Sequence, residues 1–126
     1  YAILNDNGTY WLHRYLFYNV KDDGDLSYLG SSTSPKTDLS GCSEIANAKY
    51  FACSNAANAF YYATDKAVYS FSPTSGNSAS RLVYSCSANE TVTTIHVPGV
   101  GGWPTGSCMF YIALWDSNKQ EGKLLE

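Results

Sequence analysis

Short apolar segments separated by polar breaks dominate the middle of the chain. The stretch "NAFYYATDKAVYSFSPTSG" (residues 58–76) carries five aromatic residues, and its hydrophobic positions follow neither a helical period nor a membrane span. Residues 67–71, "AVYSF", alternate so that Val68 and Ser70 point to one face, as a half-buried strand requires. Four strands are predicted in this region, at residues 49–53, 59–63, 67–71 and 81–86. Tight turns between them, including one that begins at Pro73, predict an antiparallel meander.

Part of this pattern occurs again further along the chain. "FYYA" at residues 60–63 is echoed by "FYIA" at residues 110–113, fifty positions later, and each is followed by a turn that contains an aspartate, Asp65 or Asp116. The alternating segment at residues 91–97 takes the place of residues 49–53, and "GKLLE" (residues 122–126) is the next strand. A repeat of this length indicates an architecture built from similar supersecondary units.

A weaker copy precedes both. Residues 1–4 and 9–17 are predicted to form a hairpin around Asn7-Gly8, the strongest turn signal in the sequence. Residues 25–30, "DLSYLG", are predicted to form the outermost strand of this unit.

Four antiparallel strands repeated every forty to fifty residues are typical of a β-propeller blade. We therefore predict an all-β fold: one β-propeller segment of about three four-stranded antiparallel blades, at approximately residues 1–40, 45–86 and 90–126, with a β-sandwich as the alternative. Three partial blades cannot close a ring. For this reason, and because the sequence begins at Tyr1 and stops inside a predicted strand, we expect these residues to be part of a longer chain.

Composition agrees with a β fold and excludes several partners. Eleven tyrosines and an aromatic content of 15% fit a pleated, half-buried surface. A net charge of −3 argues against a nucleic-acid backbone or an anionic membrane surface as partner. The spacing of the four cysteines does not predict a zinc site, and it leaves buried thiols and disulfides as equal alternatives. These residues are Cys42, Cys53, Cys86 and Cys108.

Residues 43–76 followed by residues 110–126 resemble the propeller part of PKD-like surface lipoproteins from gut Bacteroidetes. The shared elements are the "NAKYFA" strand, the "FYYA…VYSF" hairpin, the Pro/Thr/Ser/Gly turn and the Lys/Glu/Gly-rich turn near the end, about half of the chain. The resemblance implies an exported protein, anchored by lipid on the extracellular side of the outer membrane, near a glycan or peptide uptake system. It implies no catalytic residues.

Few residues are candidates for chemistry. Trp103, in the glycine-rich loop "GVGGWPTGS", is the one candidate ligand-binding residue, as a platform for a sugar ring or a partner protein. His13 and His96 lack an orienting partner at a recognised spacing, so we interpret both as packing residues. "KDDGD" (residues 21–25) lacks the register of a calcium loop and is interpreted as a solvated turn. Tyr10, in an aromatic strand, is assigned to packing between blades. No catalytic residue, metal site or cofactor is predicted.

The sequence therefore predicts a non-catalytic extracellular binding or scaffold module. Taken with the resemblance, it would be an accessory surface lipoprotein of an outer-membrane nutrient-uptake complex, with a transporter or other complex proteins, and an oligosaccharide or peptide, as partners. One alternative is a propeller-type carbohydrate-active enzyme. It would need paired carboxylates, but Asp6, Asp65 and Asp116 are interpreted as turn formers. The other alternative is a purely structural subunit of a complex.

Overall fold

The fold was analysed in a computed structural model of the chain. It describes residues 1–126 except 14–18, 21–25, 28–36, 55–58, 74–78 and 99–108. The described part is all-β, as predicted, with a single 3₁₀ turn and no α-helix. The elements are β1 (Ala2–Asp6), β2 (Thr9–His13), β3 (Asn19–Val20), β4 (Leu26–Ser27), β5 (Thr37–Asp38), η1 (Ile45–Asn47), β6 (Tyr50–Ser54), β7 (Ala59–Ala63), β8 (Ala67–Phe71), β9 (Ser80–Ser85), β10 (Glu90–His96), β11 (Tyr111–Asp116) and β12 (Glu121–Leu125).

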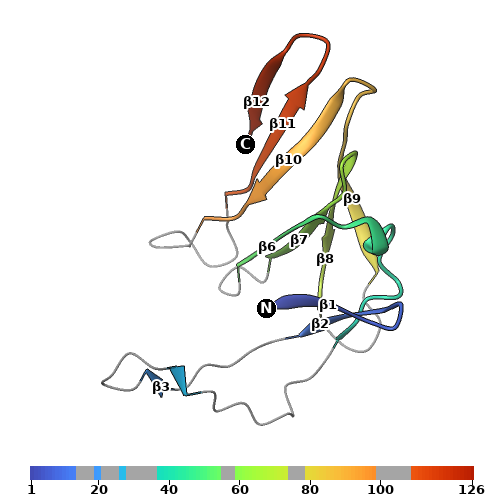
Figure 1. Cartoon of the computed structure of the whole chain (residues 1–126), viewed down its shortest axis with the longest axis vertical. Coiled ribbons are helices and arrows are strands. Elements are labelled where there is room, and N and C mark those ends of the chain that lie inside the picture. Colours follow the sequence, from blue (N-terminus) through green and yellow to red (C-terminus); the bar gives the residue numbers. More distant parts are fainter. Residues whose placement is uncertain (14–18, 21–25, 28–36, 55–58, 74–78, 99–108) are drawn as a thin grey trace.

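Three antiparallel sheets form successive layers, with β1–β2–β5 at one end, β6–β7–β8–β9 in the middle and β10–β11–β12 at the other end (Figure 1). The middle sheet is the predicted four-stranded meander, and β7 and β8 have the predicted bounds. Adjacent strands pair in sequence order, for example Cys53 opposite Phe60 and Tyr62 opposite Tyr69. None of the three sheets closes on itself, so the described residues are equally compatible with a propeller segment and a sandwich.

The β1–β2 hairpin turns at the predicted position. Asn7 and Gly8 both have positive φ, 50° and 87°, as a two-residue turn of the hairpin type requires. The side chain of Asn5 closes the turn, because its Oδ1 accepts a hydrogen bond from the Gly8 N–H at 2.8 Å.

One strand prediction for this first sheet was wrong. Residues 25–30 do not supply its outer strand: within them β4 pairs with β3, and β5 is the strand that pairs with β2. Leu39, directly after β5, is fully buried and donates its N–H to the Tyr10 carbonyl at 2.9 Å. The burial of Leu39 and its backbone hydrogen bond hold β5 beside β2. A strand of only two residues has no alternating pattern from which it could be predicted.

Both faces of the middle sheet are covered. On one face Phe60, Tyr62 and Phe71 pack with Leu12 of β2 and with the segment around η1. Tyr62 is fully buried, and its hydroxyl donates to the Ser43 carbonyl at 2.7 Å. This core joins the first sheet, the η1 segment and the middle sheet into one packed unit.

On the other face a second core joins the middle sheet to the third. Ala63 and Val68 pack against four apolar residues of β10 and β11, which are Val92, Ile95, Ile112 and Leu114. Beside this core the rings of Tyr61 and Phe110 stack with centroids 4.0 Å apart. The alternation predicted for β8 is therefore correct, because Val68 lies in this core while Phe71 lies in the other.

Candidate binding site

The turns that connect the sheets gather charged and polar groups at the ends of β7, β10 and β11. Lys66, in the β7–β8 turn, donates its ammonium group to the carbonyl of Ala88 at 3.0 Å and to the carbonyl of Glu90. The backbone adds two bonds, from the Cys86 N–H to the Lys66 carbonyl at 2.8 Å and from the Val92 N–H to the Asp65 carbonyl at 2.9 Å. This turn is thus tied to the segment that leads into the third sheet.

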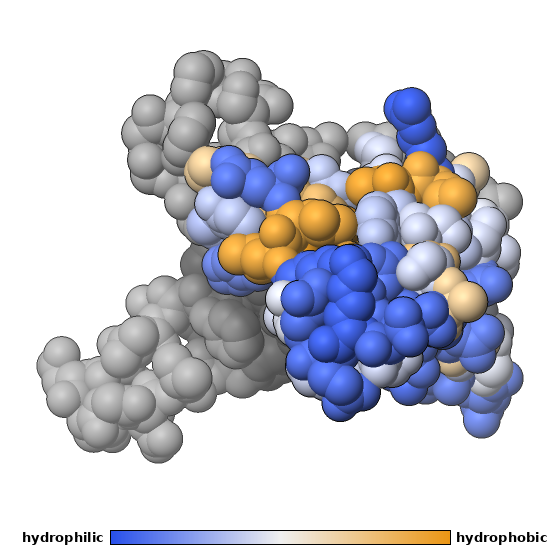
Figure 2. Space-filling model, turned by 90° about the horizontal axis from the view of Figure 1, so that it is seen from above, coloured by the Kyte–Doolittle hydropathy of each residue, from blue (hydrophilic) through white to orange (hydrophobic). Residues whose placement is uncertain are grey.

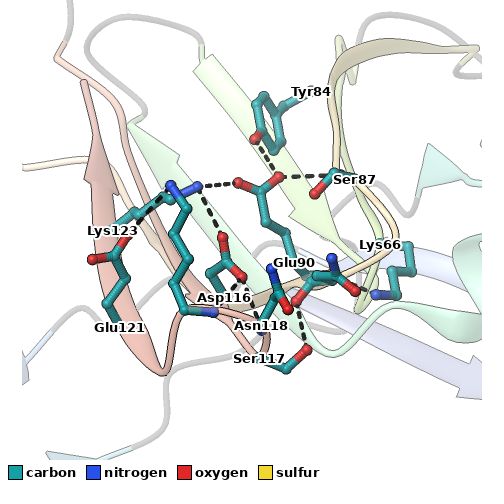
Figure 3. A network of polar contacts seen from close by, with 11 residues as sticks. Lys66, Tyr84, Ser87, Glu90, Asp116, Ser117, Asn118, Glu121 and Lys123 are labelled. Atoms are coloured by element: carbon teal, nitrogen blue, oxygen red, sulfur yellow. Dashed lines mark hydrogen bonds and ion pairs between the residues drawn. The ribbon is translucent and has the colours of Figure 1, made fainter.

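Glu90 and Lys123 form the centre of a polar network at this junction (Figure 3). The two side chains are 2.7 Å apart, and Glu90 also accepts from the Tyr84 hydroxyl and the Ser87 N–H, each at 3.1 Å. These hydrogen bonds, that from Lys123 foremost, lower the pKa of Glu90 from 4.5 to about 2. Tyr84 belongs to the middle sheet and Glu90 to the third, so the network connects the two sheets.

Asp116 takes part in the same network but is itself a turn former. Its Oδ1 accepts from the N–H groups of Asn118 and Lys119, at 3.0 and 3.2 Å, and its Oδ2 lies 3.3 Å from Lys123. Burial acts to raise the pKa of Asp116, but the hydrogen bonds from Lys119, Lys123 and Asn118 outweigh it and lower the pKa.

The turn in the middle sheet that corresponds to Asp116 is formed by Thr64 and not by Asp65. Thr64 Oγ1 accepts from the N–H groups of Lys66 and Ala67, at 3.2 and 3.1 Å, which repeats the pattern at Asp116. The structural match between the two hairpins is therefore shifted by two residues from the "FYYA"/"FYIA" echo. Such a shift preserves which side chains face the core.

Asp65 is paired with Lys49 across the open end of the β6–β7 hairpin. Their side chains are 2.6 Å apart and about half exposed, 56% for Lys49 and 44% for Asp65. The hydrogen bond to Asp65 raises the pKa of Lys49. An exposed pair of this kind contributes little to stability. Its interest lies in its position beside the hollows described next.

Two adjoining hollows lie beside this pair. The larger, about 510 Å³, is bounded by the η1 segment and the β7–β8 turn, and it is lined by Glu44, Ala46, Asn47, Ala48, Lys49, Thr64, Asp65 and Lys66. The smaller, about 250 Å³, lies between the first and middle sheets and is lined by Ile3, Asn5, Tyr10, Ile45, Ala48, Lys49, Tyr50 and Phe51. Ala48 and Lys49 line both. The larger volume is within the range of small-molecule sites.

Of the residues singled out from the sequence, Asp65 lines the larger hollow and Tyr10 the smaller one, and the others do not line either hollow or lie outside the described residues. Trp103 and the loop at residues 21–25 lie outside the described residues, as does Cys108. His13 ends β2 in the first sheet and His96 ends β10 in the third, so the structure does not bring the two histidines together. Asp6, at the end of β1, accepts a hydrogen bond from the neighbouring Asn7 amide at 3.3 Å.

Metal and thiol chemistry find little support in the part of the chain described here. Within it, His, Cys, Asp and Glu side chains do not gather in groups of three that could hold a metal ion. No disulfide links Cys42, Cys53 and Cys86 to one another. Burial raises the pKa of the Cys42 thiol to about 11, which disfavours the reactive thiolate.

Sequence reasoning missed the hollows, and it gave Tyr10 a packing role only. Tyr10 does pack against the first core, but it also lines the smaller hollow and accepts a hydrogen bond from the Asn5 amide at 3.2 Å. The Lys49–Asp65 pair had a readable signal. Predicted antiparallel strands at 49–53 and 59–63 already place opposite charges at the open end of their hairpin.

Comparison of the chain with protein-family models, with curated proteins and with solved structures gave no significant match. No helix in the described ranges is long and apolar enough to cross a membrane. The candidate site is therefore interpreted from its own geometry.

Proposed function

We propose that the chain is a non-catalytic binding module, built on a segment of a β-propeller. The observation that carries this proposal is the position of the two hollows. The hollows adjoin at Ala48 and Lys49, at one end of the middle sheet. Both faces of this sheet are packed, and its β7–β8 turn is hydrogen-bonded to the segment that leads into the third sheet. A rigid scaffold that presents loops and a concave surface is the usual basis of recognition.

The propeller is favoured over the sandwich by the repeated unit. The third sheet repeats the turn chemistry of the middle sheet, and each sheet meets the next through an apolar core. The far face of the third sheet carries exposed apolar residues, Trp115 (40% exposed) and Leu124 (68%). Seen from that end of the molecule, apolar residues lie exposed beside strongly hydrophilic ones (Figure 2). The face that carries Trp115 and Leu124 corresponds to the face of the middle sheet that packs against the third sheet. A further blade of the same kind would therefore cover it.

The absence of catalysis is proposed from the contacts of the acidic residues in the candidate turns. Asp116 caps its turn, Asp65 pairs with Lys49, and Asp6 accepts from its neighbour in the chain. The contacts of Asp116 and Asp6 follow from turn geometry, and Asp65 is engaged by its ion pair with Lys49. A glycosidase would instead direct two carboxylates at one substrate bond.

The cellular setting is proposed from the resemblance to PKD-like surface lipoproteins alone. In that setting the module is anchored on the outer membrane and serves a nutrient-uptake complex. Fractionation of the source cells tests this: recovery with the outer membrane together with a transporter is expected, and recovery in the cytosol would contradict it.

Binding itself is tested by screening the purified chain against arrays of oligosaccharides and peptides. We expect a ligand whose binding is weakened by Lys49→Met. Product analysis of the same mixtures should return the ligand intact. Cleavage of a bound ligand would establish the enzyme instead, and the absence of any ligand would favour a purely structural subunit.

A further inference from the structure

The charged residues around the hollows are already occupied by the protein. Lys49 pairs with Asp65 at 2.6 Å, and Lys66 is bonded to two backbone carbonyls of the next segment. Glu44, the remaining charged residue of the lining, forms no ion pair with another described residue. The lining as a whole carries two acids and two lysines. A strongly charged ligand would have to displace these contacts, so the charge pattern favours a neutral one.

The smaller hollow offers neutral hydrogen-bonding groups over an apolar floor. Ile3, Ile45 and Ala48 supply apolar surface, and Tyr10 and Phe51 add aromatic rings. The Tyr10 hydroxyl accepts from the Asn5 amide, which leaves its own proton for an external acceptor. Asn47, on the rim of the larger hollow, is exposed and carries both donor and acceptor atoms.

We propose that this pair of hollows binds an uncharged carbohydrate. A sugar ring has an apolar face and a rim of hydroxyl groups that both donate and accept. Apolar and aromatic surface beside neutral amide and hydroxyl groups matches that chemistry. Ala48 and Lys49 line both hollows, so adjacent sugar units would occupy them in turn. The inference rests on the proposed binding function and names its ligand class.

The test is isothermal titration calorimetry of the full chain with neutral hexasaccharides, namely maltohexaose, cellohexaose and mannohexaose. Hexagalacturonate serves as the anionic probe and a neutral alanine–glycine hexapeptide as the peptide probe. At least one neutral sugar is expected to bind more tightly than both. Its Kd should change less than about twofold between low and high salt, because screening acts on charged ligands.

Matched variants locate the site. Tyr10→Leu removes the ring while it keeps apolar bulk, and should weaken binding by about tenfold. Tyr84→Leu is its control, since Tyr84 is also half-buried and hydrogen-bonded but lines neither hollow. Lys49→Met is paired with Lys119→Met, whose lysine is similarly exposed, 59% against 56%, and also lies in an ion pair. Both controls should bind as the unaltered chain does, and circular dichroism shows whether each variant is folded.

The results distinguish a failure of the carbohydrate proposal from a failure of the proposed binding function. Binding of the hexapeptide or of hexagalacturonate alone, lost in Lys49→Met but not in Lys119→Met, would overturn the carbohydrate and leave the binding module standing. Sugar binding that is equally weakened in folded Tyr10→Leu and Tyr84→Leu would overturn the location. No binding of any probe by the folded chain would overturn both proposals.

Discussion

Leu114 and Leu124 provide a sharp test of how the third sheet is packed. They lie on adjacent strands of one sheet but on opposite faces, with 2% of Leu114 and 68% of Leu124 exposed. Leu114 belongs to the core shared with the middle sheet. Substitution of each by alanine removes the same atoms, so the difference in effect reports only the environment.

The expected cost follows from burial. Leu114→Ala removes three buried carbon groups, which at about 0.8 kcal/mol each gives about 2.4 kcal/mol of transfer free energy. The cavity left behind raises the loss in stability toward about 3 kcal/mol, within the observed span of about 2–5 kcal/mol. Leu124→Ala should stay within about 0.5 kcal/mol, as exposed substitutions usually do.

Urea denaturation followed by tryptophan fluorescence measures both variants. With a slope of about 2 kcal/mol per molar, Leu114→Ala should lower the midpoint by about 1.5 M, and Leu124→Ala should leave it nearly unchanged. Equal losses in the two variants would refute the packing described here, because they would mean that both faces of β11–β12 are buried in the folded chain. A larger loss for Leu124→Ala would mean that the sheet is turned the other way.

Three further predictions concern the polar network, the first hairpin and the thiols. Because the pKa of Glu90 is lowered from 4.5 to about 2, its contribution to stability is complete above pH 4.5 and is lost as the pH falls toward 2; Glu90→Gln should flatten this part of a stability-versus-pH curve, and an unchanged slope would count against the Lys123 contact. Gly8→Ala should cost about 1–2 kcal/mol in denaturant unfolding, because Gly8 has φ of 87°, and a neutral result would contradict the turn geometry. Buried Cys42 should react with iodoacetamide more slowly than half-buried Cys86 in the native chain and at a similar rate in urea, as peptide mapping would detect; equal native rates would be inconsistent with its burial.

The middle sheet could be predicted from sequence because its information is local. Alternation and aromatic content gave β7 and β8 their bounds, and Asn7-Gly8 gave the first hairpin its turn. The position of β5 could not be predicted, since two residues have no period. Their pairing with β2 depends on a fully buried neighbour, Leu39, which is a tertiary effect.

The candidate site was less accessible to sequence reasoning. Its hollows are assembled from the β1–β2 hairpin, the η1 segment and the β7–β8 turn, so no local pattern encodes them. The ion pair of Lys49 with Asp65 could have been predicted, because the expected pairing of the two strands already places these residues close together. Tyr10 illustrates the difficulty, since an aromatic residue that packs at a core can also line a surface hollow. Trp103, the candidate chosen from sequence, stays a prediction.

The proposed function requires that these sheets are blades of a propeller that presents the hollows at Ala48 and Lys49. An experimental structure of the complete protein tests it most directly. We expect further four-stranded meanders arranged around a common axis, one of which covers the face of the third sheet that carries Trp115 and Leu124. Closure of the sheets into a two-layered sandwich, with no repeat around an axis, would contradict it.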